Sequence, residues 1–248
     1  MVSSLFNAFF YNPIYNALVA LVAVIPWSDV GIAVIIVTIV VRLILLPFSL
    51  SAARTQRSMK ILEPKLKEVK EIHKGDKEKE ALATLELYRE AKVNPFASIL
   101  TVFIQIPVLL ALYFVFYYEP LSTINAARLY SFTPTPEAVS LLFLGIVSVS
   151  GKSLVLAILA GVSQYMQAHL ALKGTMKPSD TKSMQNDFQR MMGAQLKYVF
   201  PFIIGAISYT TSGAIALYFL TTNIAGSLQE LYIRRVFAKE TSQSVSPQ

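Results

Sequence analysis

One arginine within an apolar stretch constrains this chain more than any other residue. Residues 30–50 read VGIAVIIVTIVVRLILLPFSL, and Arg42 is the only charged residue among them. A charged side chain at the centre of a membrane-spanning helix costs about 3 kcal/mol on insertion scales. The helix therefore tolerates Arg42 only where its guanidinium reaches water, an acidic partner or a substrate.

The composition is that of an integral membrane protein. Of the 248 residues, 54% are hydrophobic and 15% are charged, and the mean hydropathy is +0.52. A soluble domain carries more charge and less apolar sequence than this. The chain has no cysteine, which excludes disulfides, thiolate metal sites and a cysteine nucleophile.

The N-terminal segment, residues 1–27, is apolar but is interrupted by Asn7, Asn12 and Asn16. Its apolar residues recur at helical spacing, which predicts an extracytoplasmic amphipathic helix lying in the membrane interface. A membrane-spanning helix is the alternative, and it would expose the asparagines to lipid. Ser28 or Asp29 can cap the helix that follows.

Five apolar segments predict five membrane spans, at about residues 30–50, 96–118, 153–172, 195–210 and 213–233. Between the first two lies a charged segment, residues 51–94, with two apolar stripes at helical spacing on either side of Gly75. The second stripe consists of Ala81, Leu82, Leu85 and Tyr88. Two antiparallel helices would bury the stripes against each other. The predicted fold is all-α, with a five-helix membrane domain at 28–236 that includes this helical hairpin, and a tail at 237–248.

Charge distribution predicts the orientation of the chain. Nineteen of the 22 Lys and Arg residues lie in 51–94, in 173–197 and after the last span. Lys and Arg collect on the cytoplasmic side of membrane proteins. We therefore expect the N-terminus outside and the hairpin and C-terminus in the cytoplasm.

With this orientation, the polar residues of four spans fall on the cytoplasmic half, whereas the outer halves are almost wholly apolar. This pattern predicts a cavity that is wet from the cytoplasm and sealed from the outside. The only acid within a span is Glu230, at the inner edge of the last one, so Arg42 has no built-in partner in sequence. The alternative is that these polar residues only join helices. The candidate cavity residues are Thr38, Arg42, Gln105, Ser163, Gln164, Gln167, Thr222 and Asn223.

Four stretches also carry a family resemblance: TIVVRLILLPFSLSAARTQRSM, LYREAKVNPFASILTVFIQIPVLLALY, ILAGVSQYMQ and SGAIALYFLTTNIAGSLQELYIRR. Together they resemble the YidC/Oxa/Alb membrane protein insertases over about residues 28–236, in the bacterial form without a large periplasmic domain. The resemblance implies a hydrophilic groove, open to cytoplasm and lipid, in which Arg42 attracts the polar segment of a substrate. It also implies a slide for the substrate along Ile106, Val108, Leu109 and Phe219. Phe219 stands where the family has an aromatic residue with a polar edge.

The implied function is to insert and help fold newly made proteins in the bacterial plasma membrane, with no enzymatic chemistry and no cofactor. Nascent membrane proteins and the lipid bilayer are the implied partners. The ribosome, the signal recognition particle pathway and the Sec translocon are further candidates, and no specific nucleic acid is expected. The hairpin would receive the nascent chain through Arg54, Arg57, Lys60, Lys65 and Lys67. A small-solute carrier or channel with a membrane-embedded arginine is the alternative function.

Overall fold

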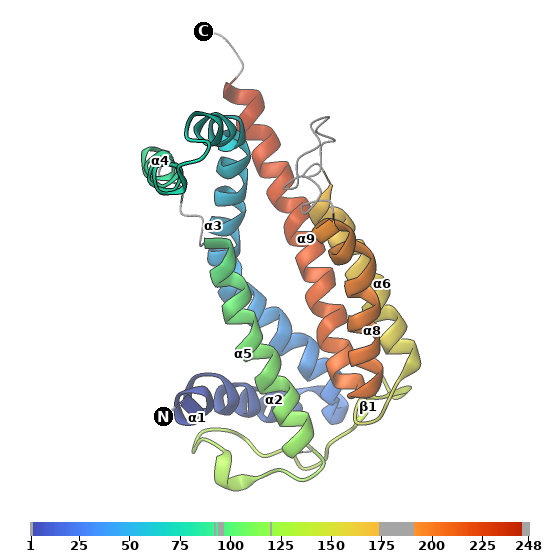
Figure 1. Ribbon diagram of the computed structural model, residues 1–248. Helices are drawn as coiled ribbons and strands as arrows, with labels where there is room; N and C mark the ends of the chain where they lie inside the picture. Colours follow the sequence, from blue (N-terminus) through green and yellow to red (C-terminus); the bar gives the residue numbers. More distant parts are fainter. Residues whose placement is uncertain (1, 92, 94–96, 120, 174–190, 245–248) are drawn as a thin grey trace. The chain divides into compact units, whose positions relative to one another are not determined.

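A computed structural model describes residues 2–91, 93, 97–119, 121–173 and 191–244 (Figure 1). The described chain is mostly helical and divides into two compact units. The first unit comprises Met1–Arg42 and Val108–Gln248, and the second comprises Leu43–Pro107.

The elements follow one another as helices with one small β-hairpin. They are α1 (Val2–Phe6), the π-helix η1 (Asn7–Tyr11), α2 (Asn12–Val24), the short helix η2 (Pro26–Ser28), α3 (Val30–Ile72), α4 (Lys77–Glu90), α5 (Ala97–Tyr118), the short helix η3 (Ala126–Arg128), β1 (Leu142–Phe143), β2 (Val147–Ser148), α6 (Leu154–Leu172), the π-helix η4 (Gln195–Val199), α8 (Phe200–Thr210) and α9 (Gly213–Ser244).

Four helices among the described residues are long and apolar enough to cross a membrane: Ser4–Val24, Val30–Thr55, Leu154–Leu172 and Met191–Thr210. The last three coincide with predicted spans. The apolar part described for the second predicted span, Gln105–Tyr118, is shorter. Helix α9 is not among the four. The structure confirms an all-α membrane protein, and the five-span core stays a prediction.

The N-terminal helix lies crosswise to α6, α8 and α9 within the first unit (Figure 1). An orientation crosswise to the spans is typical of helices that lie in the membrane interface. The orientation favours the interfacial placement, although Ser4–Val24 has the length and composition of a span.

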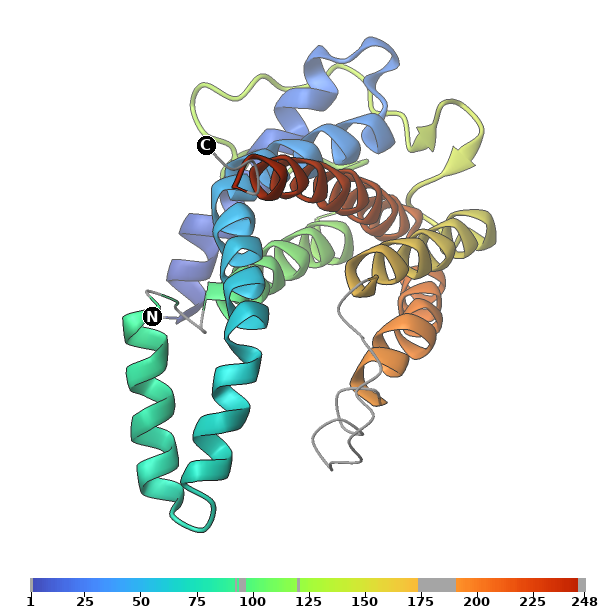
Figure 2. The same cartoon turned by 90° about the horizontal axis from the view of Figure 1, so that it is seen from above.

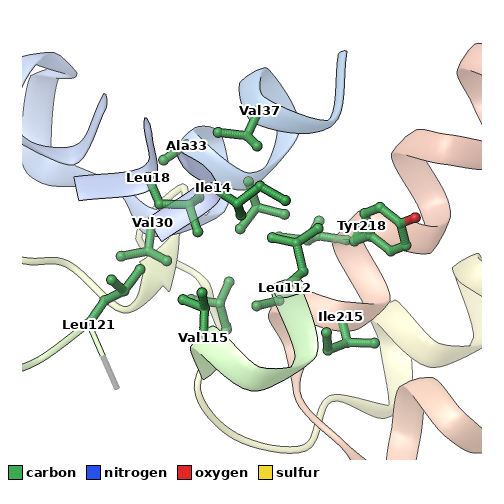
Figure 3. Close-up of a cluster of buried hydrophobic side chains, with 14 of the residues drawn as sticks. Ile14, Leu18, Val30, Ala33, Val37, Leu112, Val115, Leu121, Ile215 and Tyr218 are labelled. Atoms are coloured by element: carbon green, nitrogen blue, oxygen red, sulfur yellow. The ribbon is translucent and has the colours of Figure 1, made fainter. Parts of the chain in front are cut away.

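The core of the first unit lies where four helices meet (Figure 3). Ile14 from α2, Val37 from α3, Leu112 from α5 and Ile215 from α9 all belong to one buried cluster. The apolar run VGIAVIIV at the start of α3 supplies Val30, Ala33 and Val34, which are fully buried. The segments predicted as apolar outer halves thus pack against one another.

Helices α6, α8 and α9 pack closely at glycines. A Cβ atom at Gly161 of α6 would lie 3.1 Å from the carbonyl oxygen of Pro201, and one at Gly205 of α8 would lie 3.6 Å from that of Ala157. Small residues allow such close backbone approach between membrane helices. The backbone N–H of Gly213 donates to the carbonyl of Gly151, so α6 and α9 begin at the same end of the unit.

Asn16 of α2 holds the segment that follows α5. Its side-chain N–H donates to the carbonyl of Arg128 at 3.0 Å, and its side-chain oxygen accepts from the N–H of Tyr130 and the hydroxyl of Thr133 at 2.7 and 2.8 Å. The side chain is buried. The predicted exposure of Asn16 to lipid in a spanning helix is therefore not seen, because its polar atoms bond to the loop.

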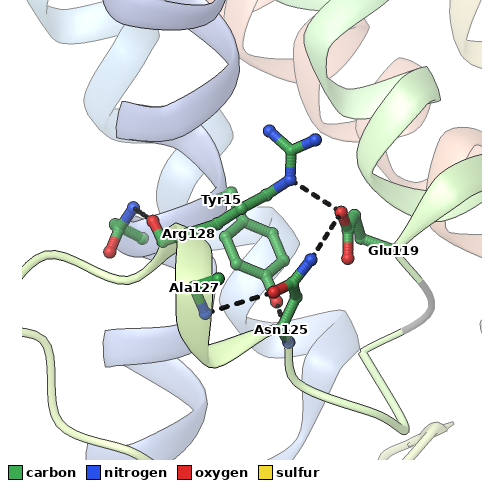
Figure 4. A network of polar contacts seen from close by, with 6 residues as sticks. Tyr15, Glu119, Asn125, Ala127 and Arg128 are labelled. Atoms are coloured by element: carbon green, nitrogen blue, oxygen red, sulfur yellow. Dashed lines mark hydrogen bonds and ion pairs between the residues drawn. The ribbon is translucent and has the colours of Figure 1, made fainter.

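We call the bonds of Asn16 to the loop after α5 the Asn16 clamp. A second set of polar contacts extends it (Figure 4). The hydroxyl of Tyr15 accepts from the N–H of Asn125 at 2.8 Å. Glu119, at the end of α5, accepts from Asn125 and from the Nε of Arg128. The loop after α5 is thus bonded to two successive residues of α2.

The second unit contains the helical hairpin. The last part of α3 and α4 lie side by side and are joined by a tight turn (Figure 2). Gly75 has a φ of 101° in this turn, and the side chain of Asp76 accepts from the N–H of Lys79 as the N-cap of α4. That hydrogen bond lowers the pKa of the Asp76 carboxyl.

The two apolar stripes are not both buried. Leu62 of α3 is buried, whereas Leu82 and Leu85 of α4 are exposed. The half-buried positions of α4 are Glu80, Ala83, Thr84, Leu87 and Tyr88. The prediction that Leu82 and Leu85 are buried is wrong because the buried face of α4 is rotated towards Ala83 and Leu87.

Replacing Asn16 with Ala should destabilise the first unit. The change removes three long-range hydrogen bonds and leaves the buried N–H of Tyr130 unpaired, which should lower the free energy of unfolding by about 2–3 kcal/mol. Unfolding of the purified protein in detergent measures the loss, and hydrogen exchange of residues 125–133 localises it. Asn12→Ala is the matched control, since the side-chain oxygen of Asn12 has no hydrogen-bond partner in the described chain. Equal losses in both variants would contradict the clamp.

Candidate functional site

Arg42 directs its guanidinium at the backbone of α9. One terminal nitrogen donates to the carbonyl oxygen of Thr222 at 3.0 Å. The Nε atom is buried and has no hydrogen-bond partner among the described residues. No described Asp or Glu lies within ion-pair distance of Arg42. In the described chain, the charge predicted from sequence to lack a built-in acid thus donates to a backbone carbonyl and has no carboxylate partner.

Gly226 opens the surface of α9 to this contact. It lies one turn after Thr222, so a side chain there would tilt back over the Thr222 carbonyl. A Cβ atom at Gly226 would overlap the side-chain amide of Gln167 and would lie 3.5 Å from the terminal nitrogen of Arg42. Arg42 of α3 and Gln167 of α6 therefore meet at one bare turn of α9. Sequence reasoning missed Gly226, although a glycine within a helix is a visible signal of close packing.

Asn223 and Ser163 join α9 to α6. The side-chain N–H of Asn223 donates to the hydroxyl of Ser163 at 3.0 Å and to the carbonyl of Ala160 at 3.3 Å. The hydroxyl of Ser163 donates to the same carbonyl at 2.8 Å. Both side chains are buried. These contacts join two helices.

Two further candidates sit in buried positions with different partners. The hydroxyl of Thr38 donates to the carbonyl of Val34, one turn earlier in α3, at 2.7 Å. The hydroxyl of Thr222 is buried without a hydrogen-bond partner in the described chain. Thr222 therefore has a carbonyl that is bonded to Arg42 and a hydroxyl that is unpaired in the described chain. Buried polar groups of this kind usually bind water or a ligand.

The other predicted residues are distributed over both units. Gln164, next to Ser163 on α6, is half-buried. Gln105, half-buried, and Ile106, exposed, belong to the second unit. In the first unit Val108 and Phe219 are part of the buried core, and Leu109 packs against it. The slide along these residues stays a prediction.

The basic residues predicted to receive a nascent chain lie on α3. Arg54, Lys65 and Lys67 are exposed. The side chains of Arg57 and Lys60 lie outside the described part of the structure. Their role stays a prediction.

Arg234 of α9 was not singled out from sequence, yet its side chain binds the carbonyl groups at the C-terminal end of α6. Its Nε atom bonds to Glu230 at 2.8 Å, and its terminal nitrogen donates to the carbonyls of Leu170 and Lys173. The last carbonyls of a helix lack partners within the helix. Arg234 supplies hydrogen-bond donors to these carbonyls from α9. At the other end of α6, the N–H of Gly213 at the start of α9 bonds to Gly151, which precedes α6.

The chemistry open to this site is electrostatic. In the described chain no group of three or more His, Asp or Glu residues is placed to hold a metal ion. What the site offers is a positive charge, an unpaired hydroxyl and an amide on three facing helices. Such groups attract polar or anionic segments.

Comparison with known proteins gives one family. Residues 22–240 match the family described as 60Kd inner membrane protein. A membrane protein insertase YidC from Fusobacterium nucleatum is 31% identical over 208 residues, covering 84% of this chain and 87% of its own length. One from Oceanobacillus iheyensis is 27% identical, covering 93% of this chain and 84% of its own length. One from Nitrosomonas europaea is 28% identical over 88% of this chain, which spans only 31% of that relative.

The bond between Asn223 and Ser163 should be measurable as a coupling energy. We expect Asn223→Ala and Ser163→Ala each to destabilise the protein, and a double-mutant cycle to give a coupling of about 0.6–1.7 kcal/mol, the range for hydrogen bonds between membrane helices. Unfolding in detergent or bicelles provides the four free energies. Ser227→Ala replaces Asn223→Ala in the control cycle, because its hydroxyl bonds only within α9. A coupling near zero in the first cycle would contradict the bond.

Proposed function

Because the chain belongs to the 60Kd inner membrane protein family, we propose that it inserts newly made proteins into the bacterial inner membrane and helps them fold. The relatives named membrane protein insertase YidC align over most of this chain. The proposal assigns the work to binding and orientation of the substrate, without bond chemistry, nucleotide or cofactor.

The observation that carries the proposal is the unpaired charge of Arg42. Its terminal nitrogen donates to the carbonyl of Thr222, and its Nε atom has no hydrogen-bond partner in the described chain. A charge in a membrane span that has no counter-ion is costly unless water or a ligand compensates it. The unpaired hydroxyl of Thr222 beside it increases the cost. A polar or acidic segment of an arriving chain would satisfy both groups at once.

The proposed mechanism lowers the barrier for the polar end of the substrate. An apolar substrate helix gains about 25 cal/mol per Å² of surface removed from water, which supplies the driving force. Its polar tail opposes insertion because charged groups are expensive in the bilayer. Arg42, Thr222 and the amide of Gln167 would bind that tail part-way across the membrane. Gln164, next to Ser163 on α6, would extend the hydrophilic groove that leads there, and the part of Gln105 in the groove stays a prediction from sequence.

The route into lipid remains part of the proposal. Ile106 is exposed and can meet a substrate directly. Val108 and Phe219 are buried, so they would join the slide only when α5 and α9 move apart locally. The hairpin, with exposed Arg54, Lys65 and Lys67, would receive nascent chains on the cytoplasmic side. The ribosome, the signal recognition particle pathway and the Sec translocon are proposed partners there.

Arg42→Ala should impair insertion of single-span substrates with acidic tails. Loss of one charge-assisted hydrogen bond, about 1.5 kcal/mol, corresponds to a fall of about tenfold in insertion rate. Arg42→Lys keeps the charge and should largely preserve the rate. Insertion into proteoliposomes containing the purified variant measures both.

The matched control is the same substrate with its acidic residues changed to amides. Its insertion should depend much less on Arg42. If Arg42→Ala slowed both substrates equally, the arginine would act through the structure of the insertase. If it slowed neither, the charge would have no part in the reaction.

Water access provides an independent test, since the chain has no cysteine of its own. A single cysteine at Gln164 or Gln167 should react with a hydrophilic thiol reagent added from the cytoplasmic side. One at Leu110 should not react, although the side chain is exposed, because lipid covers it. One at Val34, which is fully buried, serves as the packed control. Equal labelling at Gln164 and Leu110 would contradict a groove that is wet on one side.

A further inference from the structure

Backbone strain in the described chain is concentrated at one corner of the first unit. Three residues other than glycine have positive φ angles: Trp27 at 64°, Ser28 at 52° and Leu144 at 52°. Side chains disfavour this region, so residues are held there only where the surroundings enforce it. Trp27 and Ser28 immediately precede α3, and Leu144 is in the turn between β1 and β2. Segments more than 100 residues apart thus share the same unusual conformation.

The buried carboxylate of Asp29 ties these two segments together. One oxygen accepts from the N–H groups of Gly31 and Ile32 at 2.7 and 3.1 Å, which caps α3. The other accepts from the N–H of Leu144 at 2.7 Å. The backbones of Ser28 and Val30 also bond to Ser140. The side chain of Asp29 therefore fixes both the start of α3 and the turn of the β-hairpin between β1 and β2.

The β-hairpin formed by β1 and β2 also packs directly on the first turn of α3. A Cβ atom at Gly31 would lie 2.6 Å from the ring of Phe143, so the ring rests on bare backbone. Figure 2 shows the two strands at the periphery of the helices at this end of the first unit. The arrangement turns Phe143 inwards and leaves the residues of the turn outside.

The strained corner presents large apolar side chains outwards. Trp27 is 85% exposed, Ile146 is 81% exposed and Leu144 is 60% exposed. No Asp, Glu, Lys or Arg occurs between Glu137 and Lys152, so the hairpin has no charge of its own. Exposed apolar groups gathered at one place mark a surface that binds something apolar.

We propose that Trp27, Leu144 and Ile146 form a membrane anchor that inserts into the lipid leaflet at the N-terminal end of α3. Lipid is the occupant that fits, because the surface is uncharged, the first apolar span begins three residues after Trp27, and tryptophan favours the membrane interface. Strands of two residues offer little edge for pairing with another protein. Asp29 holds the anchor in its strained, outward conformation.

The anchor sets a depth for the candidate site. Arg42 follows Val30 by twelve residues along the same helix, or about 18 Å at 1.5 Å per residue. Fixing the start of α3 in the interface therefore fixes the level at which the guanidinium sits. This consequence rests on the proposed function of Arg42, whereas the anchor itself needs only the membrane.

The only tryptophan of the chain, Trp27, reports directly on the anchor. The full-length protein is reconstituted in nanodiscs whose phospholipids carry bromine near the headgroup or deep in the acyl chain. We expect blue-shifted Trp27 emission, a loss of intensity with the shallow bromine that exceeds the loss with the deep one, and little quenching by aqueous acrylamide. Ile146→Glu should red-shift the emission and reduce quenching by lipid. Ile146→Val is the matched control and should behave like the wild type.

Each other result counts against the proposal. Strong acrylamide quenching without bromine quenching would place Trp27 in water. Protection from both quenchers would place it against protein, such as a second copy of the chain. Equal bromine quenching in the wild type and in Ile146→Glu would remove Ile146 from the anchor. The position is 81% exposed, and an unchanged unfolding transition would show that the variant remains folded. Insertion assays play no part in these measurements, so failure of the anchor is separate from failure of the insertase proposal.

Discussion

A guanidinium with no carboxylate partner among the described residues is the constraint on which the arrangement around the candidate site depends. Arg42 extends from α3 to the surface of α9 at Gly226, where it donates to the carbonyl of Thr222. That surface exists because Gly226 lacks a side chain, and Gln167 fills the remaining space. Partial compensation by a backbone dipole keeps the charge in place but leaves its hydrogen-bonding capacity incomplete. A fully paired arginine would be more stable and less available to a substrate.

The polar residues of the spans divide into two groups that look alike in sequence. Asn223 and Ser163 form hydrogen bonds with each other and with the carbonyl of Ala160, as residues that join helices do. Arg42 and Thr222 keep unpaired groups. Both groups have similar depth and similar chemistry, so hydropathy and periodicity could not separate them. Whether a polar side chain is paired depends on the residue that faces it, and that residue lies on another helix.

Much of the fold follows from local rules. Apolar length predicts α6 and the start of α3, and Gly75 with Asp76 predicts the turn of the hairpin. The missing acid near Arg42 is also visible in sequence. The clamp at Asn16 is not, because its partners are backbone groups more than 100 residues away that carry no sequence signal. The rotated face of α4 could not be predicted for a related reason. Leu82 and Leu85 fit the helical period, but the half-buried face carries Ala83 and Leu87 instead.

The clamp at Asn16 has a consequence for the way this protein is itself made. Asn16 is synthesised early, but its partners Arg128, Tyr130 and Thr133 follow 112–117 residues later. At roughly 5–20 residues per second, the ribosome delivers them about 6–23 s afterwards. During that interval the side-chain N–H of Asn16 can bond to the carbonyl of Asn12 within α2, but its side-chain oxygen lacks the N–H of Tyr130 and the hydroxyl of Thr133. The loop after α5 must arrive on the same side of the membrane to complete these bonds. The N-terminal helix can therefore reach its final form only after the second predicted span has been placed, so biogenesis has a built-in order.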